Sequence, residues 1–375
     1  MPYTSIDDGS KYFQTATWTG GNDSSRTVTN DGNSDLQPDL IWAKARTSTS
    51  YTDDHFMVDS SRGRLKGLVP NDSDAETTTT GNESQQAERD LVSFNSDGFT
   101  VGIVNSTAAL NASSASNVAW QWSINGGTTS SNSDGSITST VQVNQTAGIS
   151  IVTFTGNNTN DATIGHGLGV TPAMIITKNR SDAVSWRVWH QNLTADTSLF
   201  LNDTNGETGA GSHGAGYIKT VGSSTYSTYQ GTSDSNGVNG SSDSMIAYCF
   251  AEKKGFSKIG QYYGNGNGTS GGGHGPFIYT GFKPAFVMIK RTNTSGNFFI
   301  MDTKRDPINV MDKRLFANLT NAEQTNTEYV VDFYSNGFKL KGYVSQSNAS
   351  GSRYTYMAFA SNPFVSSQGI PTTAR

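Results

Sequence analysis

Apolar positions along this chain come in short runs that small polar residues separate. The runs are rich in Ile, Val, Phe, Trp and Tyr, and clusters of Gly, Asn, Asp and Ser bound them. This pattern is typical of β-strands. The pairs Asp97-Gly98 and Asn336-Gly337 predict hairpin turns, because type I′ turns need positive φ at both central positions. No long stretch follows the 3.6-residue period of an amphipathic helix, so the pattern predicts an all-β fold.

One pattern of proline, apolar run and lysine occurs three times. The copies are QPDLIWAKAR (37–46), TPAMIITKNR (171–180) and KPAFVMIKRT (283–292). The apolar runs are almost continuous, which predicts a central strand buried on both faces, and proline is tolerated at the first residue of a strand. A glycine stands upstream of each copy, at positions 20, 156 and 264. The chain is therefore predicted to repeat one module three times.

A second motif also recurs downstream of each copy. Its three forms are NDSDAE (71–76), NDTNGE (202–207) and NLTNAE (318–323). In the first form, Asp72, Asp74 and Glu76 offer oxygen ligands of the kind that calcium prefers, but the spacing of an EF-hand loop is missing. The charge at Asp72 is replaced by Leu319 in the third copy, whereas the turn-forming residues persist. The motif therefore favours a structural turn, with metal binding at Asp72, Asp74 and Glu76 as the alternative.

The repeats predict three tandem β-sandwich modules of jelly-roll type. Residues 1–124 would hold an N-terminal segment and the first module, and residues 125–148 a Gly/Ser/Thr-rich linker with one strand at 136–143. The second module would occupy 149–253. The third would occupy 254–375 and end in an extended tail.

The surface implied by the composition is polar but weakly charged. Charged residues make up 15% of the chain and the net charge is −5. No basic stripe is present, which argues against nucleic-acid binding, and no apolar stretch approaches the length of a membrane span. The single cysteine, Cys249, lies in the apolar run MIAYCFAE and is expected to be a buried thiol.

Motifs of known catalytic chemistry are missing from the sequence. It contains no H-x-x-x-H pair and no G-x-S-x-G elbow, and its glycine-rich loop lacks the lysine of a phosphate-binding loop. We therefore expect no catalytic residues, no enzymatic activity and no cofactor. Tyr226, Tyr229, Tyr262 and Tyr263 stand among or beside polar residues. They are candidates for carbohydrate binding by ring stacking, and the alternative is that they cover a sandwich edge.

The recurring motifs Y/W-T-G-N, N-x-T-N-A-E, S-x-G-F and Y-x-A-F-A, with the opening MPYTSIDDGSKYFQT and the closing NPFVSSQGIP, resemble a known group of proteins. They are similar to virion proteins of marine tailed bacteriophages, often labelled tail-fibre-like or of laminin-G/concanavalin-like jelly-roll type. The resemblance covers essentially the whole chain and carries over no catalytic residue. It implies a protein of the virion surface that is assembled in the host cytoplasm.

Three functions are compatible with this resemblance. The first is a tail-fibre or adhesin protein that contacts host-surface glycan during adsorption. The second is a capsid decoration, head-fibre or tail-collar protein with only protein partners. A glycan-degrading enzyme of tailspike type ranks third. In each case we expect other virion proteins as partners and a homo-oligomer, for which a trimer is one option.

Overall fold

The computed structural model describes residues 3–47, 53–78, 91–102, 110–209, 216–230, 236–267, 273–342 and 344–371. Within these residues the chain is almost entirely β, and all pairings between its named strands are antiparallel. The helical elements described are the short η1 (Gly9–Lys11), α2 (Asn236–Asn239) and α3 (Ser345–Asn348). The prediction of an all-β fold built from sandwiches is confirmed.

The same strand order occurs in three successive stretches, here called units 1, 2 and 3. Unit 1 contains β1 (Phe13–Thr19), β2 (Arg26–Val28), β3 (Leu40–Ala45), β4 (His55–Asp59), β5 (Lys66–Gly67), β6 (Thr77–Thr78), β7 (Leu91–Phe94), β8 (Phe99–Val101) and β9 (Ser116–Trp122). Unit 2 contains β12 (Ile149–Thr155), β13 (Thr163–Gly165), β14 (Met174–Asn179), β15 (Arg187–His190), β16 (Thr197–Phe200), β17 (Thr208–Gly209), β18 (Tyr217–Val221), β19 (Thr225–Tyr229) and β20 (Ser244–Phe250). Unit 3 contains β21 (Ser257–Tyr263), β22 (Phe277–Tyr279), β23 (Phe282–Arg291), β24 (Phe298–Asp302), β25 (Lys313–Phe316), β26 (Gln324–Thr325), β27 (Val331–Tyr334), β28 (Gly337–Leu340) and β29 (Arg353–Pro363).

Each unit pairs a large sheet with a small one. The large sheets contain the orders β1-β9-β3-β4, β12-β20-β14-β15 and β21-β29-β23-β24, so the last strand of a unit lies between its first and third strands. The small sheets have the order β2-β8-β7, β13-β19-β18 and β22-β28-β27. An apolar core fills the space between the two sheets of each unit. Each unit is therefore a β-sandwich of the same topology.

Residues 125–148 do not form the linker that we expected. β10 (Ser130–Asn132) and β11 (Ser139–Asn144) form a hairpin, and β11 pairs with β12, so that the large sheet of unit 2 has eight strands. Buried Asp39 fixes the turn that leads into this hairpin. Its carboxylate accepts the backbone N–H groups of residues 124, 125, 126 and 127 at 2.6–2.9 Å. The polar, Gly-rich residues of this segment therefore form an anchored turn and a hairpin at the edge of the sheet.

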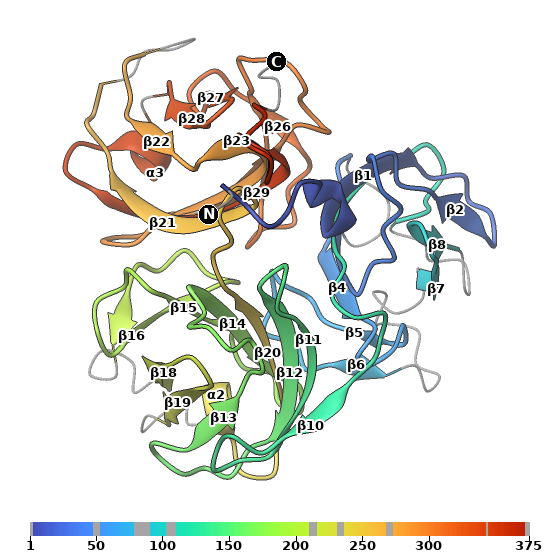
Figure 1. Cartoon of the computed structure of the whole chain (residues 1–375), viewed down its shortest axis with the longest axis vertical. Helices are drawn as coiled ribbons and strands as arrows, with labels where there is room; N and C mark the ends of the chain where they lie inside the picture. The colour runs from blue at the N-terminus through green and yellow to red at the C-terminus, as the bar shows by residue number, and fades with distance from the viewer. Residues whose placement is uncertain are drawn as a thin grey trace.

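The large sheets are buried on both faces because the three units surround a shared core. Figure 1 shows the units arranged around a common centre. This central core takes Trp42 and Trp120 from unit 1, Tyr248 from unit 2, and Phe286 and Phe359 from unit 3. Side chains of this size contribute about 1.5–3 kcal/mol each when fully buried. The central core explains why the proline-led strands β3 and β14 are buried at every position.

The recurring glycines mark places where two backbone segments touch. A Cβ atom at Gly20, Gly156 or Gly264 would lie only 2.1, 2.1 and 2.2 Å from the carbonyl oxygens of Ala112, Gly240 and Ala349, respectively. In each unit that oxygen belongs to the segment before the last strand. Any larger residue would therefore push the first strand away from this segment.

Candidate functional site

The loops formed by the Asn-x-Ser/Thr-x-x-Glu motif lie at the seams between units. The backbone N–H of Glu76 donates to Arg180 O at 2.9 Å, that of Glu207 to Thr292 O at 2.7 Å, and that of Glu323 to Arg46 O at 2.7 Å. These bonds connect unit 1 to unit 2, unit 2 to unit 3, and unit 3 back to unit 1. The chain therefore closes on itself as a ring of three head-to-tail contacts.

The glutamate side chains reinforce two of the seams in the same way. Glu76 binds Arg62 of its own unit and Arg180 of the next. Glu323 binds Arg305 of its own unit and Arg46 of the next. Although burial acts in the opposite direction, the arginines hold the pKa of both carboxyl groups below the usual value. At the remaining seam, Glu207 pairs with Arg353 instead.

The asparagine that opens the motif holds the loop against its own unit. The Oδ1 atoms of Asn71, Asn202 and Asn318 accept the backbone N–H groups of His55, Trp186 and Phe298 at 2.7–3.0 Å. The three accepted N–H groups belong to residues at the start of the fourth strand of each unit. The motif is thus a structural turn that positions its glutamate in the seam.

The geometry argues against the alternative of a metal site at Asp72, Asp74 and Glu76. The carboxylate of Glu76 lies between two guanidinium groups, which already neutralise it and would repel a cation. Asp72 accepts the backbone N–H of Ser73. Across the part of the chain that the structure describes, no group of three or more His, Cys, Asp or Glu residues is placed to hold a metal ion.

Two buried carboxylates add further contacts across the seams. Asp59 pairs with Arg62 and also accepts the hydroxyl of Tyr248 from unit 2 at 2.8 Å. In the same way, Asp302 pairs with Arg305 and accepts Nε1 of Trp120 from unit 1 at 3.0 Å. Each of these acid–arginine pairs joins residues three positions apart, so the ion pair itself is a local contact. The hydrogen bonds from the neighbouring unit were not predictable from local sequence.

The lysine that follows the apolar run of each proline-led motif is buried, and its ammonium group donates hydrogen bonds to backbone carbonyls. Lys44 Nζ donates to Ala45 O, Lys178 Nζ to Asn179 O, and Lys290 Nζ to Thr204 O, at 2.6–2.9 Å. Burial lowers the pKa of Lys44 to about 8 and that of Lys290 to about 7. The bond from Lys290 crosses the seam between units 2 and 3.

Sequence reasoning missed one repeated asparagine. Asn111, Asn239 and Asn348 are fully buried, and their Oδ1 atoms accept the N–H of the residue after the recurring glycine. The signal was present as Asn-Ala/Gly-Ser before the last strand of each unit, at 111–113, 239–241 and 348–350. In a chain rich in Asn and Ser this triplet does not stand out.

The four candidate sugar-binding tyrosines do not form a common site. Tyr226 and Tyr262 are 1% and 7% exposed and lie in the cores of units 2 and 3, so the prediction that their rings contact a glycan is wrong. Tyr229 is half-buried and stacks on Tyr217, with ring centroids 5.0 Å apart. Tyr263, on β21, is 58% exposed and is the one of the four that is open to solvent.

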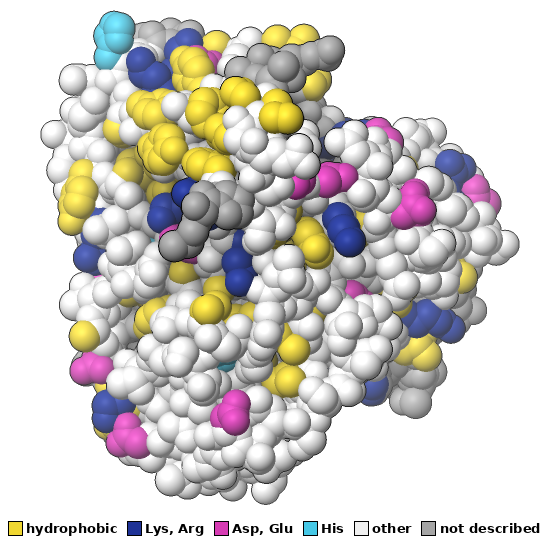
Figure 2. All heavy atoms as spheres, viewed as in Figure 1, with side chains coloured by type: hydrophobic (Ala, Val, Ile, Leu, Met, Phe, Trp, Pro, Cys, Tyr) yellow, Lys and Arg dark blue, Asp and Glu magenta, His cyan; other side chains and the backbone are white. Residues whose placement is uncertain are grey.

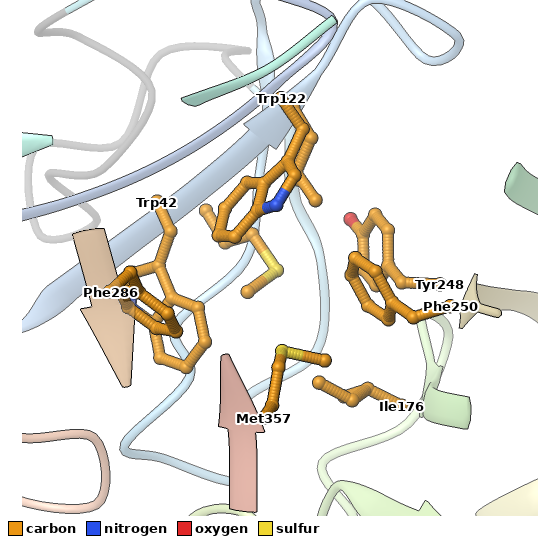
Figure 3. Close-up of a pocket in the computed structure, with 9 residues that line it drawn as sticks. Trp42, Trp122, Ile176, Tyr248, Phe250, Phe286 and Met357 are labelled. Carbon is orange, nitrogen blue, oxygen red and sulfur yellow. The ribbon is translucent and has the colours of Figure 1, made fainter. Parts of the chain in front are cut away.

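A small apolar cavity lies in the central core, where the three units meet. Figure 3 shows Trp42, Trp122, Tyr248, Phe286 and Met357 around it, so that every unit contributes to its wall. Its volume is about 10 Å³. A cavity of this size holds one water molecule at most, and an apolar lining disfavours even that. The cavity is therefore a packing gap of the ring.

An exposed aromatic surface lies on the outer face of the small sheet of unit 3. We call Phe277, Tyr279 and Tyr334 the aromatic face; they are 47%, 58% and 40% exposed. The rings of Phe277 and Tyr334 meet edge to face with centroids 6.0 Å apart. Figure 2 shows hydrophobic side chains gathered over this part of the molecule.

A polar pocket of about 410 Å³ adjoins the aromatic face at Tyr279. The N-terminal segment, the connection between units 2 and 3, the start of β21 and the turn after β22 complete its wall. The residues are Tyr3, Glu252, Lys254, Gly255, Ser257, Lys258, Thr280 and Gly281. The hydroxyl of Tyr3 donates to Gly281 O at 2.6 Å, and Lys254 Nζ lies 4.5 Å from the centre of the Tyr3 ring. The volume is within the range of small-ligand pockets.

Comparison with known proteins places the chain in a family. A family model described as "Domain of unknown function (DUF7483)" matches residues 8–363. The chain belongs to the DUF7483 family. No curated protein and no solved structure matches the chain significantly.

The DUF7483 match begins just before η1 and ends in β29, so it contains all three units and all three seams. The matched residues therefore contain the whole ring of this chain. Among the described residues of this DUF7483 chain, no helix has the length and apolar character that crossing a membrane requires.

Proposed function

We propose that this DUF7483 protein is a structural protein of a bacteriophage virion surface, of the tail-fibre or adhesin type, that contacts host-surface glycan during adsorption. The observation that carries the proposal is that the recurring residues face inward, whereas the residues that face outward differ between units. The recurring Asn, Glu, Lys and Gly residues point into the seams and cores. The outward faces of the units differ from one another, as expected of a rigid scaffold that displays binding surfaces.

The weakly charged surface supports the same proposal. With 15% charged residues, the scaffold presents mainly hydroxyl, amide and backbone groups. These groups exchange hydrogen bonds with sugar hydroxyls as readily as with water, so each contact is weak. Many copies on one particle would convert weak contacts into firm attachment. The proposal assigns no catalytic step and no cofactor to the chain.

Two experiments test the proposal: locating the protein in the phage particle, and using the purified protein as a competitor of phage adsorption. Mass spectrometry and immunogold labelling of purified particles should detect the chain on the outside of the tail. Purified protein, added to host cells before phage, should slow adsorption in a dose-dependent way. Absence of the chain from intact particles would contradict the virion role. Unchanged adsorption at saturating protein would contradict the adhesin role alone.

A capsid decoration, head-fibre or collar protein is the second candidate, and the ring favours it. Three similar units around a centre match a three-fold position on a capsid lattice, where each unit could meet an equivalent capsid subunit. Cryo-electron microscopy of the particle discriminates between the two candidates. Density for the ring on the capsid lattice supports decoration, and density on the tail supports the adhesin.

A further inference from the structure

The three small sheets offer an internal comparison, because one backbone carries three different outer faces. Register places Phe277 and Tyr279 opposite Lys339 and Gly337 in unit 3. The same register in unit 1 holds Thr27 and, one residue beyond β2, Thr29. Tyr334 likewise corresponds to Asn95 in the turn of unit 1. Unit 1 shows that this fold tolerates polar residues at all three positions.

In unit 2 the equivalent face of the small sheet is partly covered by another segment of the chain. Its residues at this register are Thr163 and Gly165. A Cβ atom at Gly165 would lie 1.6 Å from Oδ1 of Asn132, a residue of the β10–β11 hairpin. The hairpin thus covers the position that Tyr279 occupies in unit 3. Exposed aromatic rings are therefore a property of unit 3 and are not required by the fold.

We propose that the aromatic face and the adjoining polar pocket bind a polysaccharide of pyranose rings that carry carboxylate groups. This inference rests on the proposed function and names the ligand chemistry and the contact site. Phe277 and Tyr279 point to the same side of one strand, about 7 Å apart. Two exposed rings at this spacing present apolar surfaces for the C–H faces of pyranose rings, and tyrosine adds a hydroxyl for hydrogen bonding.

The charges around the site select an acidic ligand. Four lysines and two carboxylates lie on or beside the aromatic face and in the pocket. Lys258 pairs with Glu252, and Lys341 pairs with Asp332. Lys254 and Lys339 form no ion pair with any described residue. Two positive charges therefore remain in a protein whose net charge is −5, and they suit a carboxylate-bearing chain.

The extent of the aromatic face argues for a glycan over a second protein chain. Three rings that are about half exposed offer roughly 300 Å² of apolar surface. A stable protein interface buries about 800 Å² on each partner, usually around a fully desolvated apolar centre. Exposed Ile308 and Val310 flank Asn309, which bonds to Phe333 beside the face, and even with them the apolar surface stays below that size. Lysines and the pocket also border the face, and the Ser, Thr, Tyr and Lys side chains of the pocket offer hydrogen bonds to a hydroxyl-rich ligand.

The test replaces the aromatic face with the residues of unit 1. The triple variant Phe277→Thr, Tyr279→Thr and Tyr334→Asn is compared with the unaltered full chain on immobilised polygalacturonate, alginate and dextran. We expect the unaltered chain to bind the two uronate polymers and to bind dextran weakly. The triple variant should lose binding to the uronates about tenfold or more. Matching circular dichroism and melting temperature verify that the variant is folded.

Two further variants control the result. Tyr263→Thr removes an equally exposed tyrosine from β21 and introduces the residue of the same register in units 1 and 2, Thr19 and Thr155. This variant should bind like the unaltered chain. Lys254→Gln combined with Lys339→Gln should weaken binding to uronates and reduce its dependence on salt, while leaving dextran binding unchanged.

Each outcome bears on one proposal. Equal binding by the triple variant, or no uronate binding by the unaltered chain, overturns this inference. If the triple variant instead turns a dimer into a monomer in analytical ultracentrifugation, the face is a contact between copies and the inference also fails. The virion role is judged separately, by the presence of the chain in particles. An adhesin that acts through another face would still slow adsorption after the triple substitution.

Discussion

Glu323 and Arg46 lie 277 residues apart in the chain and are joined by two parallel hydrogen bonds of 2.7 and 2.9 Å between carboxylate and guanidinium. This contact ties unit 3 to unit 1 and thereby closes the ring. Glu323 also binds Arg305, whose side chain is fully buried. The pair is therefore part of a desolvated network, where removal of one partner leaves a charge without compensation.

Replacement of Glu323 by Ala should strongly destabilise the protein. The variant leaves the buried guanidinium of Arg305 with one carboxylate fewer, which we expect to cost about 3 kcal/mol in unfolding free energy. Urea denaturation followed by tryptophan fluorescence measures it. The matched control is Asp31→Ala, which breaks the exposed Lys304–Asp31 bridge between the same two units and should change little. Equal effects of the two variants would contradict the closure role.

Replacement of Asp39 by Asn should loosen the connection between units 1 and 2. The Asp39 carboxylate accepts four backbone N–H groups of residues 124–127 and the hydroxyl of Ser60. The side-chain amide of Asn would point its own N–H groups at some of these backbone N–H groups. We expect this loss of acceptors to cost about 2–3 kcal/mol in unfolding free energy. Limited proteolysis should then cut between residues 124 and 148. Asp134→Asn, in the exposed turn of the same hairpin, should leave the cleavage pattern unaltered.

Stability should fall as the pH falls from 6.5 towards 4. Burial lowers the pKa of His55 to about 3 and that of His190 to about 4, and both lie at contacts between units. In an unfolded chain both imidazoles have the ordinary histidine pKa of 6.5. The unfolded state therefore binds more protons in this window, and unfolding free energy decreases as pH decreases. Well above pH 6.5 the two imidazoles are neutral in both states, so their contribution is complete there.

Denaturation curves measured across this pH window test the histidine contribution. His190→Gln keeps a donor of similar size and should reduce the slope of stability against pH by about one proton. His274→Gln, at an exposed position, should leave the slope unchanged. A profile that stays flat from pH 7 to 5 would sink the assignment of His55 and His190 as buried neutral groups.

The thiol of Cys249 should resist modification in the folded protein. It is fully buried in the core of unit 2, and burial raises its pKa to about 12. Thiolate is the reactive form, so neither access nor ionisation favours reaction at neutral pH. Reaction with an aromatic disulfide reagent should be complete in denaturant and negligible without it. Rapid labelling of the native chain would show that unit 2 opens readily.

Local patterns were enough to predict the strands and the repeat. Alternation, turn pairs and the proline-led apolar runs predicted an all-β chain of sandwiches, and the motif Asn71–Glu76 was interpreted correctly as a turn. These features act over a few residues, so a single sequence contains them. The fully buried β3 and β14 were also predicted, although the reason, a core shared by three units, was not.

The tyrosines show why the site was harder to predict. Tyr262 and Tyr263 are neighbours in similar sequence surroundings, yet they are 7% and 58% exposed, because successive side chains of a strand point to opposite faces. Tyr279, which no motif marked, lies on the exposed side of its strand. Which side of a strand faces solvent depends on the sheet packed against it, and that sheet comes from elsewhere in the chain.

The sequence by itself determined the elements of this DUF7483 protein and their threefold recurrence, because propensity, alternation and turn chemistry are local. The tertiary structure decided the closure of the ring, the pairing of β11 with β12, the partners of Glu76 and Glu323, and the exposure of the aromatic face. Each of these depends on contacts between residues that are distant in the chain. Such contacts form only when the packed units bring the residues together, since no local pattern specifies a remote partner.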